Sequence, residues 1–246
     1  MELKEVKEIV ANTPNMTLEE ARSLERLLPD SGSLRVLELG IGHGVSTCYL
    51  AAAVGSRGGQ LTSVDLESAR RRSPNVYELL KLCGLEPVVT VHLEPTSYTW
   101  RLMRLLQEDP SPRFDLCYLD AAHSWFVDGF GFFLVDRLLK PGGWLVLDDL
   151  RWAFSSSSIR DTDYVRAMPM DERDANQVEL VYELLVKPHP NYGDFRTCGN
   201  WALARKMQSE ATSRVSTRYE IVLERPDQTL RRIARHLLGL RRRGPS

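Results

Sequence analysis

The chain has 246 residues, of which 43% are hydrophobic and 26% are charged, a balance typical of a folded globular protein. Lysine and arginine together number 32, against 33 aspartates and glutamates, so no global field attracts nucleic acid or anionic lipid. No apolar run approaches the roughly 18 residues that span a bilayer, and the charged segment Met1 to Val10 is unlike a signal peptide. These features predict a cytoplasmic protein that does not cross a membrane.

The first 33 residues are predicted to form N-terminal helices. Thr17 and Glu20 have the spacing of a capping box, in which each side chain bonds the backbone amide of the other. Apolar residues recur at helical spacing after them, and the segment Pro29 to Ser33 ends the region.

Between residues 34 and 150, short apolar runs alternate with segments of helical length. The predicted strands are Leu34–Leu39, Leu61–Val64, Val88–Leu93, Phe114–Leu119 and Trp144–Leu147. The predicted helices are Val45–Val54, Asn75–Cys83, Tyr98–Glu108 and Val127–Leu139. Such alternation argues for βαβ units, and strands that are apolar on both faces indicate helices on both sides. The expected fold class is α/β, with a doubly wound, mostly parallel sheet.

The pattern changes after Leu150. The polar segment Arg151 to Ala175 is predicted to form a loop or a short helix over one end of the sheet, and helical character returns at Val178–Val186. Two apolar runs, Phe195–Cys198 and Trp201–Ala204, are predicted to close the sheet as an antiparallel hairpin.

Residues 207–246 form a basic tail after the domain at 34–206. Apolar residues recur in this tail at helical spacing and predict an amphipathic helix. A stripe of this kind more often docks on protein than on lipid or RNA, so one expectation is a homo-oligomer formed through the tail or the N-terminal helices.

The first predicted strand runs into a glycine-rich turn, Glu38-Leu39-Gly40-Ile41-Gly42-His43-Gly44, which leads into a helix. Glycines let the backbone approach a ligand closely, and a helix N-terminus supplies free N–H donors. Val45 stands where the dinucleotide fingerprint has its third glycine, which disfavours NAD. The second strand ends at Asp65, whose carboxylate can accept both hydroxyls of a ribose. Together these features predict a nucleoside-type ligand.

In this order the motifs resemble those of the class I S-adenosylmethionine (SAM)-dependent methyltransferases, from about Thr17 to Lys206. The Lys140-Pro141-Gly142-Gly143 turn before the fifth strand is the most recognisable of them. The resemblance implies a Rossmann-like methyltransferase fold and SAM as cofactor. The implied SAM contacts are Glu38, Gly40, Gly42, His43, Gly44 and Ser46 around the turn, Asp65 at the ribose, Thr96 and Ser97 at adenine, and Asp120. The adenine segment Glu94-Pro95-Thr96-Ser97 departs from the Gly-Asp or Gly-Ala pattern of the family.

Three carboxylates follow two of the predicted strands, with Asp120 after one and Asp148 and Asp149 after the other. Open α/β sheets bind ligands at this carboxyl edge, and clustered negative charges favour a cation. Ligation by oxygen alone suits Mg²⁺, so we expect a magnesium site here. The spacing also resembles that of the catechol and macrolide-sugar O-methyltransferases, which use Mg²⁺ to hold substrate oxygens. In the alternative interpretation, Asp148 or Asp149 caps a helix or pairs with an arginine.

His123 lies three residues after Asp120 and is the candidate general base, a position that resembles the catalytic histidine of the macrolide-sugar enzymes. The alternative is a loop histidine that contacts SAM or caps the next helix. The aromatic residues Trp152, Phe154 and Tyr164 can either line an acceptor pocket or anchor the packing of their segment.

The function expected from these features is Mg²⁺-assisted transfer of the SAM methyl group to a hydroxyl of a small molecule, such as a sugar, a catechol-like compound or another natural-product intermediate. The alternatives are a metal-independent methyltransferase, a nucleic-acid methyltransferase that uses the basic tail, and a SAM-binding protein without turnover. An NAD-dependent oxidoreductase is disfavoured by Val45.

Overall fold

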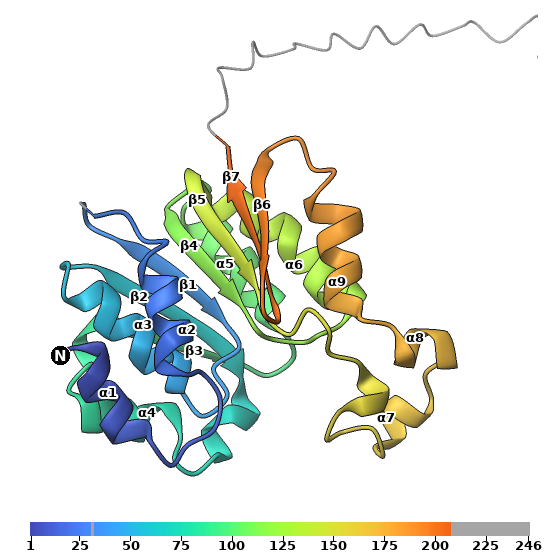
Figure 1. Cartoon of the computed structure of the whole chain (residues 1–246), viewed down its shortest axis with the longest axis horizontal. Coiled ribbons are helices and arrows are strands. Elements are labelled where there is room, and N and C mark those ends of the chain that lie inside the picture. Colours follow the sequence, from blue (N-terminus) through green and yellow to red (C-terminus); the bar gives the residue numbers. More distant parts are fainter. Residues whose placement is uncertain (31, 208–246) are drawn as a thin grey trace, which may run out of the picture. The chain divides into compact units, whose positions relative to one another are not determined.

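A computed structural model describes residues 1–30 and 32–207, and the amphipathic helix expected in the tail lies outside these residues. Seven strands form one sheet in the order β3-β2-β1-β4-β5-β7-β6 (Figure 1). The strands are β1 (Arg35–Leu39), β2 (Gln60–Leu66), β3 (Val89–Glu94), β4 (Phe114–Leu119), β5 (Leu139–Leu147), β6 (Tyr192–Cys198) and β7 (Trp201–Lys206). β1 to β5 pair in parallel, whereas β7 pairs antiparallel with β5 and β6. The predicted parallel sheet with a closing antiparallel hairpin is therefore confirmed.

Helices connect the strands and precede them. The longer ones are α1 (Leu3–Val10), α2 (Leu18–Glu25), α3 (Val45–Gly55), α4 (Val76–Cys83), α5 (Tyr98–Glu108) and α6 (Trp125–Leu138). The shorter elements are η1 (Glu67–Arg71), η2 (Glu86–Val88), η3 (Phe154–Ser156), α7 (Asp163–Arg166), α8 (Met170–Asp174), α9 (Gln177–Val181) and the π-helical turn η4 (Tyr182–Val186). The capping box expected at Thr17 and Glu20 is present at the start of α2. No helix among the described residues is long and apolar enough to cross a membrane.

The central strands of the sheet are buried on both faces, because their alternate residues contribute to two separate cores. In β1, Val36 packs in the core that contains α1 to α4, whereas Leu37 and Leu39 pack in the core that contains α5, α6 and α9. In β4, Leu116 and Cys117 divide in the same way. This arrangement explains why the strands read as apolar without alternation.

β5 begins five residues earlier than the sequence predicts. The Lys140-Pro141-Gly142-Gly143 segment, expected to be a turn before this strand, lies inside it as an irregularity in the pairing with β4. Gly142 has a φ of +85°, which lets the chain bulge there and rejoin the ladder at Trp144, opposite Leu116.

Candidate active site

The glycine-rich turn between β1 and α3 packs tightly against two neighbouring segments. A Cβ atom on Gly40, whose φ is +94°, would lie 1.6 Å from the carbonyl oxygen of Asp120. A Cβ atom on Gly44, whose φ is +102°, would lie 2.8 Å from Cα of Val76 in α4. The backbone can therefore follow this path only with glycine at both positions.

Asp65, at the end of β2, holds the turn in place. Its Oδ2 accepts hydrogen bonds from the backbone N–H groups of Ile41 and Gly42, at 2.8 and 2.9 Å. Its Oδ1 accepts from the N–H of Leu66 at 2.6 Å. The ribose contact predicted for Asp65 is compatible with its place in the cleft described below, and the structure adds a second role in shaping the turn.

Glu38 and Ser46, both predicted to contact SAM, bond to each other beneath the turn. The Glu38 carboxylate is fully buried and accepts hydrogen bonds from Ser46 Oγ at 2.5 Å and Thr47 Oγ1 at 2.7 Å. Burial raises the pKa of Glu38 to about 7, although the hydrogen bonds from Ser46 and Thr47 oppose the shift. His43 lies in the same turn, where its Nδ1 is 2.7 Å from the carbonyl oxygen of Pro74.

A cleft of about 440 Å³ opens at the carboxyl ends of the parallel strands, where α/β sheets bind ligands. It brings together eight of the predicted site residues, which are Gly40, Gly42, Ser46, Asp65, Asp120, His123, Asp148 and Asp149. It also contains residues that the sequence did not suggest, namely Asn15, Met16, Glu20, Arg72, Tyr118 and Asn200. A smaller, mostly apolar cavity of about 130 Å³ shares Gly40 and Asp65 with the cleft and is lined by Thr96 and Ser97, the predicted adenine contacts.

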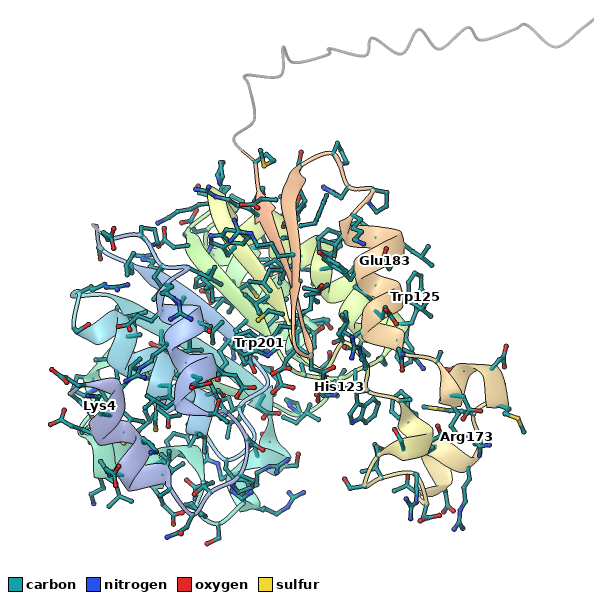
Figure 2. All side chains as sticks on the ribbon, in the orientation of Figure 1. Lys4, His123, Trp125, Arg173, Glu183 and Trp201 are labelled. Carbon is teal, nitrogen blue, oxygen red and sulfur yellow. The ribbon has the colours of Figure 1, made fainter. Side chains whose placement is uncertain are left out.

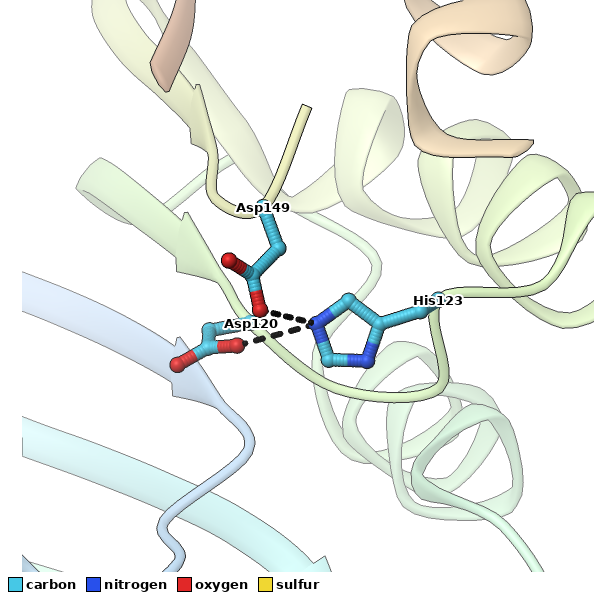
Figure 3. Close-up of side chains that lie close together, drawn as sticks. All are labelled: Asp120, His123 and Asp149. Atoms are coloured by element: carbon cyan, nitrogen blue, oxygen red, sulfur yellow. Dashed lines mark ion pairs between the residues drawn. The ribbon is translucent and has the colours of Figure 1, made fainter. Parts of the chain in front are cut away.

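Two carboxylates face the same ring nitrogen of His123 in the cleft (Figure 3). Its Nε2 is 3.2 Å from Asp120 Oδ1 and 3.1 Å from Asp149 Oδ2. His123 and Asp149 have φ values of +53° and +59°, which are uncommon for residues other than glycine and often occur at functional sites. Burial alone would lower the pKa of His123, but the two carboxylates that face its Nε2 outweigh this effect and raise the pKa to about 10. His123 therefore carries a proton at neutral pH in this state.

Asp148 makes different contacts from the other two carboxylates. Its Oδ2 accepts a hydrogen bond from the Tyr118 hydroxyl, and its Oδ1 accepts one from the N–H of Asp149 at 2.6 Å. Burial and the charge of Asp120 raise the pKa of Asp148 to about 6 against these hydrogen bonds.

Three side chains in the described part of the chain are placed to hold a metal ion together. Asp120, His123 and Asp149 each offer one ligand atom, and these atoms lie within 4.8 Å of one another. Two carboxylate oxygens with an imidazole nitrogen fit a divalent cation, and the nearby Asp148 adds a further carboxylate at the same edge. The set predicted from the sequence was Asp120, Asp148 and Asp149, and the structure adds His123 as a further candidate ligand beside two of them.

Asn200 is a functional candidate that sequence reasoning missed. It belongs to the turn between β6 and β7, and its side-chain N–H donates a hydrogen bond to Asp149 Oδ1 at 2.8 Å. Its own carbonyl and side-chain oxygens accept from the N–H groups of Leu150 and Arg151, at 2.8 and 2.9 Å. The only local signal was the Gly199-Asn200 pair of a hairpin turn, which does not reveal where the turn docks.

Trp152 packs on the face of the His123 ring. The two rings are stacked, with centroids 4.7 Å apart and planes 30° from parallel. Phe154 meets Trp152 edge-on at 4.7 Å and is itself buried. The sequence left two roles open for these aromatic residues, anchoring their segment and lining an acceptor pocket. The structure shows packing contacts for Trp152 and Phe154, and the role in an acceptor pocket stays a prediction.

Residues 37–150 match the family model described as a methyltransferase domain. Among solved structures, an O-methyltransferase from Bacillus cereus in complex with SAH has 21% sequence identity and a TM-score of 0.60, covering 83% of this chain and 90% of that chain. TomG, an O-methyltransferase from Streptomyces achromogenes involved in tomaymycin synthesis, was solved with SAM and has 20% identity and a TM-score of 0.60, covering 83% and 89%. MycE from the mycinamycin biosynthetic pathway, solved with Mg, SAH and mycinamycin VI, has 16% identity and a TM-score of 0.55, covering 95% and 59%. A search of curated protein sequences gave no significant match.

The match over residues 37–150 and the strand order shared with the SAM- and SAH-bound O-methyltransferases both support the prediction made from the sequence motifs, a SAM-dependent methyltransferase with a class I fold.

Proposed function

We propose that the protein transfers the methyl group of SAM to a hydroxyl oxygen of a small molecule, with Mg²⁺ as the assisting ion. The observation that carries this proposal is the position of three carboxylates and a histidine. Asp120, Asp148, Asp149 and His123 lie in the same cleft as the glycine turn, so an acceptor bound to an ion at these carboxylates would be close to SAM.

SAM would occupy the turn and the adjoining apolar cavity. Gly40 and Asp65 line both the cleft and that cavity, so a ligand can pass from one to the other across these two residues. Thr96 and Ser97 would then lie beside the adenine. The sulfonium of SAM is a strong electrophile, so the main task of the protein is to align the acceptor oxygen, the methyl carbon and the sulfur.

Asp120, Asp148 and Asp149 are proposed to hold Mg²⁺ at the carboxyl edge of the sheet. When bound, the ion lowers the pKa of an acceptor hydroxyl and fixes its orientation. The magnesium in MycE, a protein with the same fold, supports this choice of ion. Asp148 can contribute only if its carboxylate leaves the Tyr118 hydroxyl or uses a free lone pair.

His123 is proposed to accept the proton of the acceptor hydroxyl. Its high pKa arises from two uncompensated carboxylates, so it can act as a base only when another cation neutralises Asp120 and Asp149. Trp152 keeps the imidazole in position by stacking on it.

The acceptor is proposed to be a hydroxylated small molecule, such as a natural-product intermediate. TomG and MycE, which share the fold, belong to the tomaymycin and mycinamycin pathways and support this substrate class. The acceptor would enter beside the segment 151–175, which carries Trp152 and Phe154 next to the cleft.

The test is transfer of isotope-labelled methyl from SAM into the small-molecule fraction of an extract of the native cell. The proposal expects a labelled methyl ether, and it expects His123→Ala to lower turnover by about 10²- to 10⁴-fold with SAM affinity nearly unchanged. Label found only in macromolecules, or on nitrogen or carbon, would contradict O-methylation. Loss of SAM binding in the His123 variant would place this residue in the cofactor site.

A further inference from the structure

The outward face of α6 is apolar, unlike that of an ordinary surface helix. Phe126, Phe130 and Phe133 follow one another at intervals of four and three residues, and their exposed fractions are 60%, 56% and 46%. The inward face is apolar as well, because Phe132 and Val135 are fully buried in the core. A helix that is apolar all round is normally buried, so the exposed side of α6 is a candidate contact surface.

The apolar surface continues onto the neighbouring helix. α9 and η4 lie beside α6, and a Cβ atom on Gly129 would meet Leu185 Cδ1 at 3.0 Å. Figure 2 labels Trp125 of α6 and Glu183 of η4, whose elements cover the opposite face of the sheet from α1, which carries Lys4. A groove of about 350 Å³ runs between the elements. We refer to the exposed side chains on both helices as the α6–α9 face, which consists of Trp125, Phe126, Phe130, Phe133, Leu180 and Leu184.

The size of this face matches half of a protein interface. An aromatic side chain has about 150–250 Å² of surface, so the four aromatic residues, 39% to 60% exposed, present about 400 Å² before the leucines are counted. A standard interface buries about 800 Å² on each partner, and in homodimers about 65% of that area is apolar. The face therefore supplies most of the apolar area that a homodimer needs, and exposed apolar patches of this size are often functional.

The charges around the face are arranged for pairing with a second copy of the chain. α6 and α9 start at the same end, where Trp125 N–H donates to Gln177 Oε1 at 2.7 Å, and the acidic residues Asp171 and Glu172 line the groove there. Arg137 is exposed at the other end of α6 and pairs with no carboxylate among the described residues. A two-fold axis perpendicular to the helices would set the acidic end of one copy against the basic end of the other.

We propose that the α6–α9 face binds the same face of a second copy, forming a homodimer with antiparallel α6 helices. The phenylalanines of each copy would fill the groove of the other, and Arg137 of each copy would meet the acidic end of its partner. This surface differs from the N-terminal helices and the tail, through which the sequence suggested an oligomer. It is independent of the methyl-transfer chemistry proposed above.

The test is the mass of the full chain in solution, by light scattering and sedimentation at micromolar concentration. The proposal expects twice the 28.0 kDa of one chain for the wild type and the single-chain mass for Phe130→Glu. Leu82→Glu is the matched control, because Leu82 is 66% exposed on α4, outside the face, and this variant should remain a dimer. Circular dichroism establishes whether each variant is folded.

The charges give a second and independent arm. Arg137→Glu should raise the dimer dissociation constant by at least about tenfold. Adding Glu172→Arg to the same chain should bring the constant back towards the wild-type value, because the swapped charges can pair again. A wild-type chain that stays single at every concentration overturns the proposal, including the case where the tail or another protein covers the face. A dimer that neither Phe130→Glu nor Arg137→Glu weakens also overturns it, because the interface is then elsewhere.

Discussion

The side-chain N–H of Asn200 donates a hydrogen bond to the carboxylate of Asp149 at 2.8 Å, although the two residues are 51 positions apart in the chain. Through this bond, the hairpin that closes the sheet also fixes one of the two carboxylates that face His123. Removing a group that orients a metal ligand in this way commonly lowers metal affinity or activity by about 10- to 100-fold.

Replacing Asn200 by alanine should therefore lower Mg²⁺ affinity and turnover by about tenfold or more, while SAM affinity changes little. Calorimetry with each ligand separates the two effects. Thr197→Ala, an exposed substitution in the same hairpin, is the control and should leave both affinities unchanged. If the Asn200 variant binds Mg²⁺ like the wild type, the orienting role is wrong.

Replacing Asp65 by alanine should weaken SAM binding by about 1–3 kcal/mol. The variant loses the carboxylate expected at the ribose, and it also leaves the N–H groups of Ile41 and Gly42 without their acceptor. Asp65→Asn retains an oxygen for the turn and should bind SAM with intermediate affinity in calorimetry. Glu67→Gln, in η1 just after β2, is the control. Equal SAM affinity in wild type and Asp65→Ala would exclude both roles.

Glu38 should make stability depend on pH. Its pKa is raised from the ordinary 4.5 to about 7, so the folded protein binds this proton more tightly than the unfolded chain does. The stabilisation is complete below pH 4.5 and is lost as the pH rises towards 7, a change of about 3 kcal/mol in the free energy of unfolding.

Denaturant unfolding of wild type and Glu38→Gln between pH 4 and pH 8 measures this contribution as the difference between the two curves. The wild type should lose stability relative to the variant as the pH rises. A constant difference across this range would mean that Glu38 titrates normally despite its burial.

Replacing Gly40 by alanine should destabilise the fold by more than about 3 kcal/mol, because the new Cβ atom meets the Asp120 carbonyl oxygen and the φ is unfavourable. Gly58→Ala is the matched control, since Gly58 also has a positive φ, +68°, but no neighbour within 4 Å. Its cost should be about 1–2 kcal/mol, the cost of the backbone conformation alone. Equal losses in denaturant unfolding would show that close packing does not restrict Gly40.

The sheet and the meeting of the carboxylates could be predicted because both follow from local patterns. Apolar runs in the sequence marked the strands. The carboxyl ends of neighbouring parallel strands lie at the same edge of the sheet, so Asp120 and Asp148, which follow two such strands, were expected to lie near each other. The N–H of Asp148 donates a hydrogen bond at 2.9 Å to the carbonyl of Leu119, the residue that directly precedes Asp120, so the two aspartates are neighbours.

The direction of each side chain could not be predicted in the same way. Successive residues face different surroundings, and the positive φ of Asp149 turns its carboxylate to His123 while Asp148 meets Tyr118. Asn200 reaches the site through tertiary packing alone, which no local pattern encodes. The bulge that puts the Lys140-Pro141-Gly142-Gly143 segment inside β5 depends on pairing with β4 and was missed for the same reason.

The measurement that tests the central claim most directly is methyl transfer from labelled SAM to the acceptor fraction before and after removal of divalent ions with a chelator. The account predicts that chelation abolishes transfer, that added Mg²⁺ restores it, and that calorimetry still detects SAM binding in the chelated protein. Asp149→Asn should imitate the chelated enzyme, because it removes the charge of one of the carboxylates beside His123. Transfer that continues at the same rate after exhaustive chelation would contradict the account, and the three aspartates would then position substrate or stabilise the fold without a metal ion.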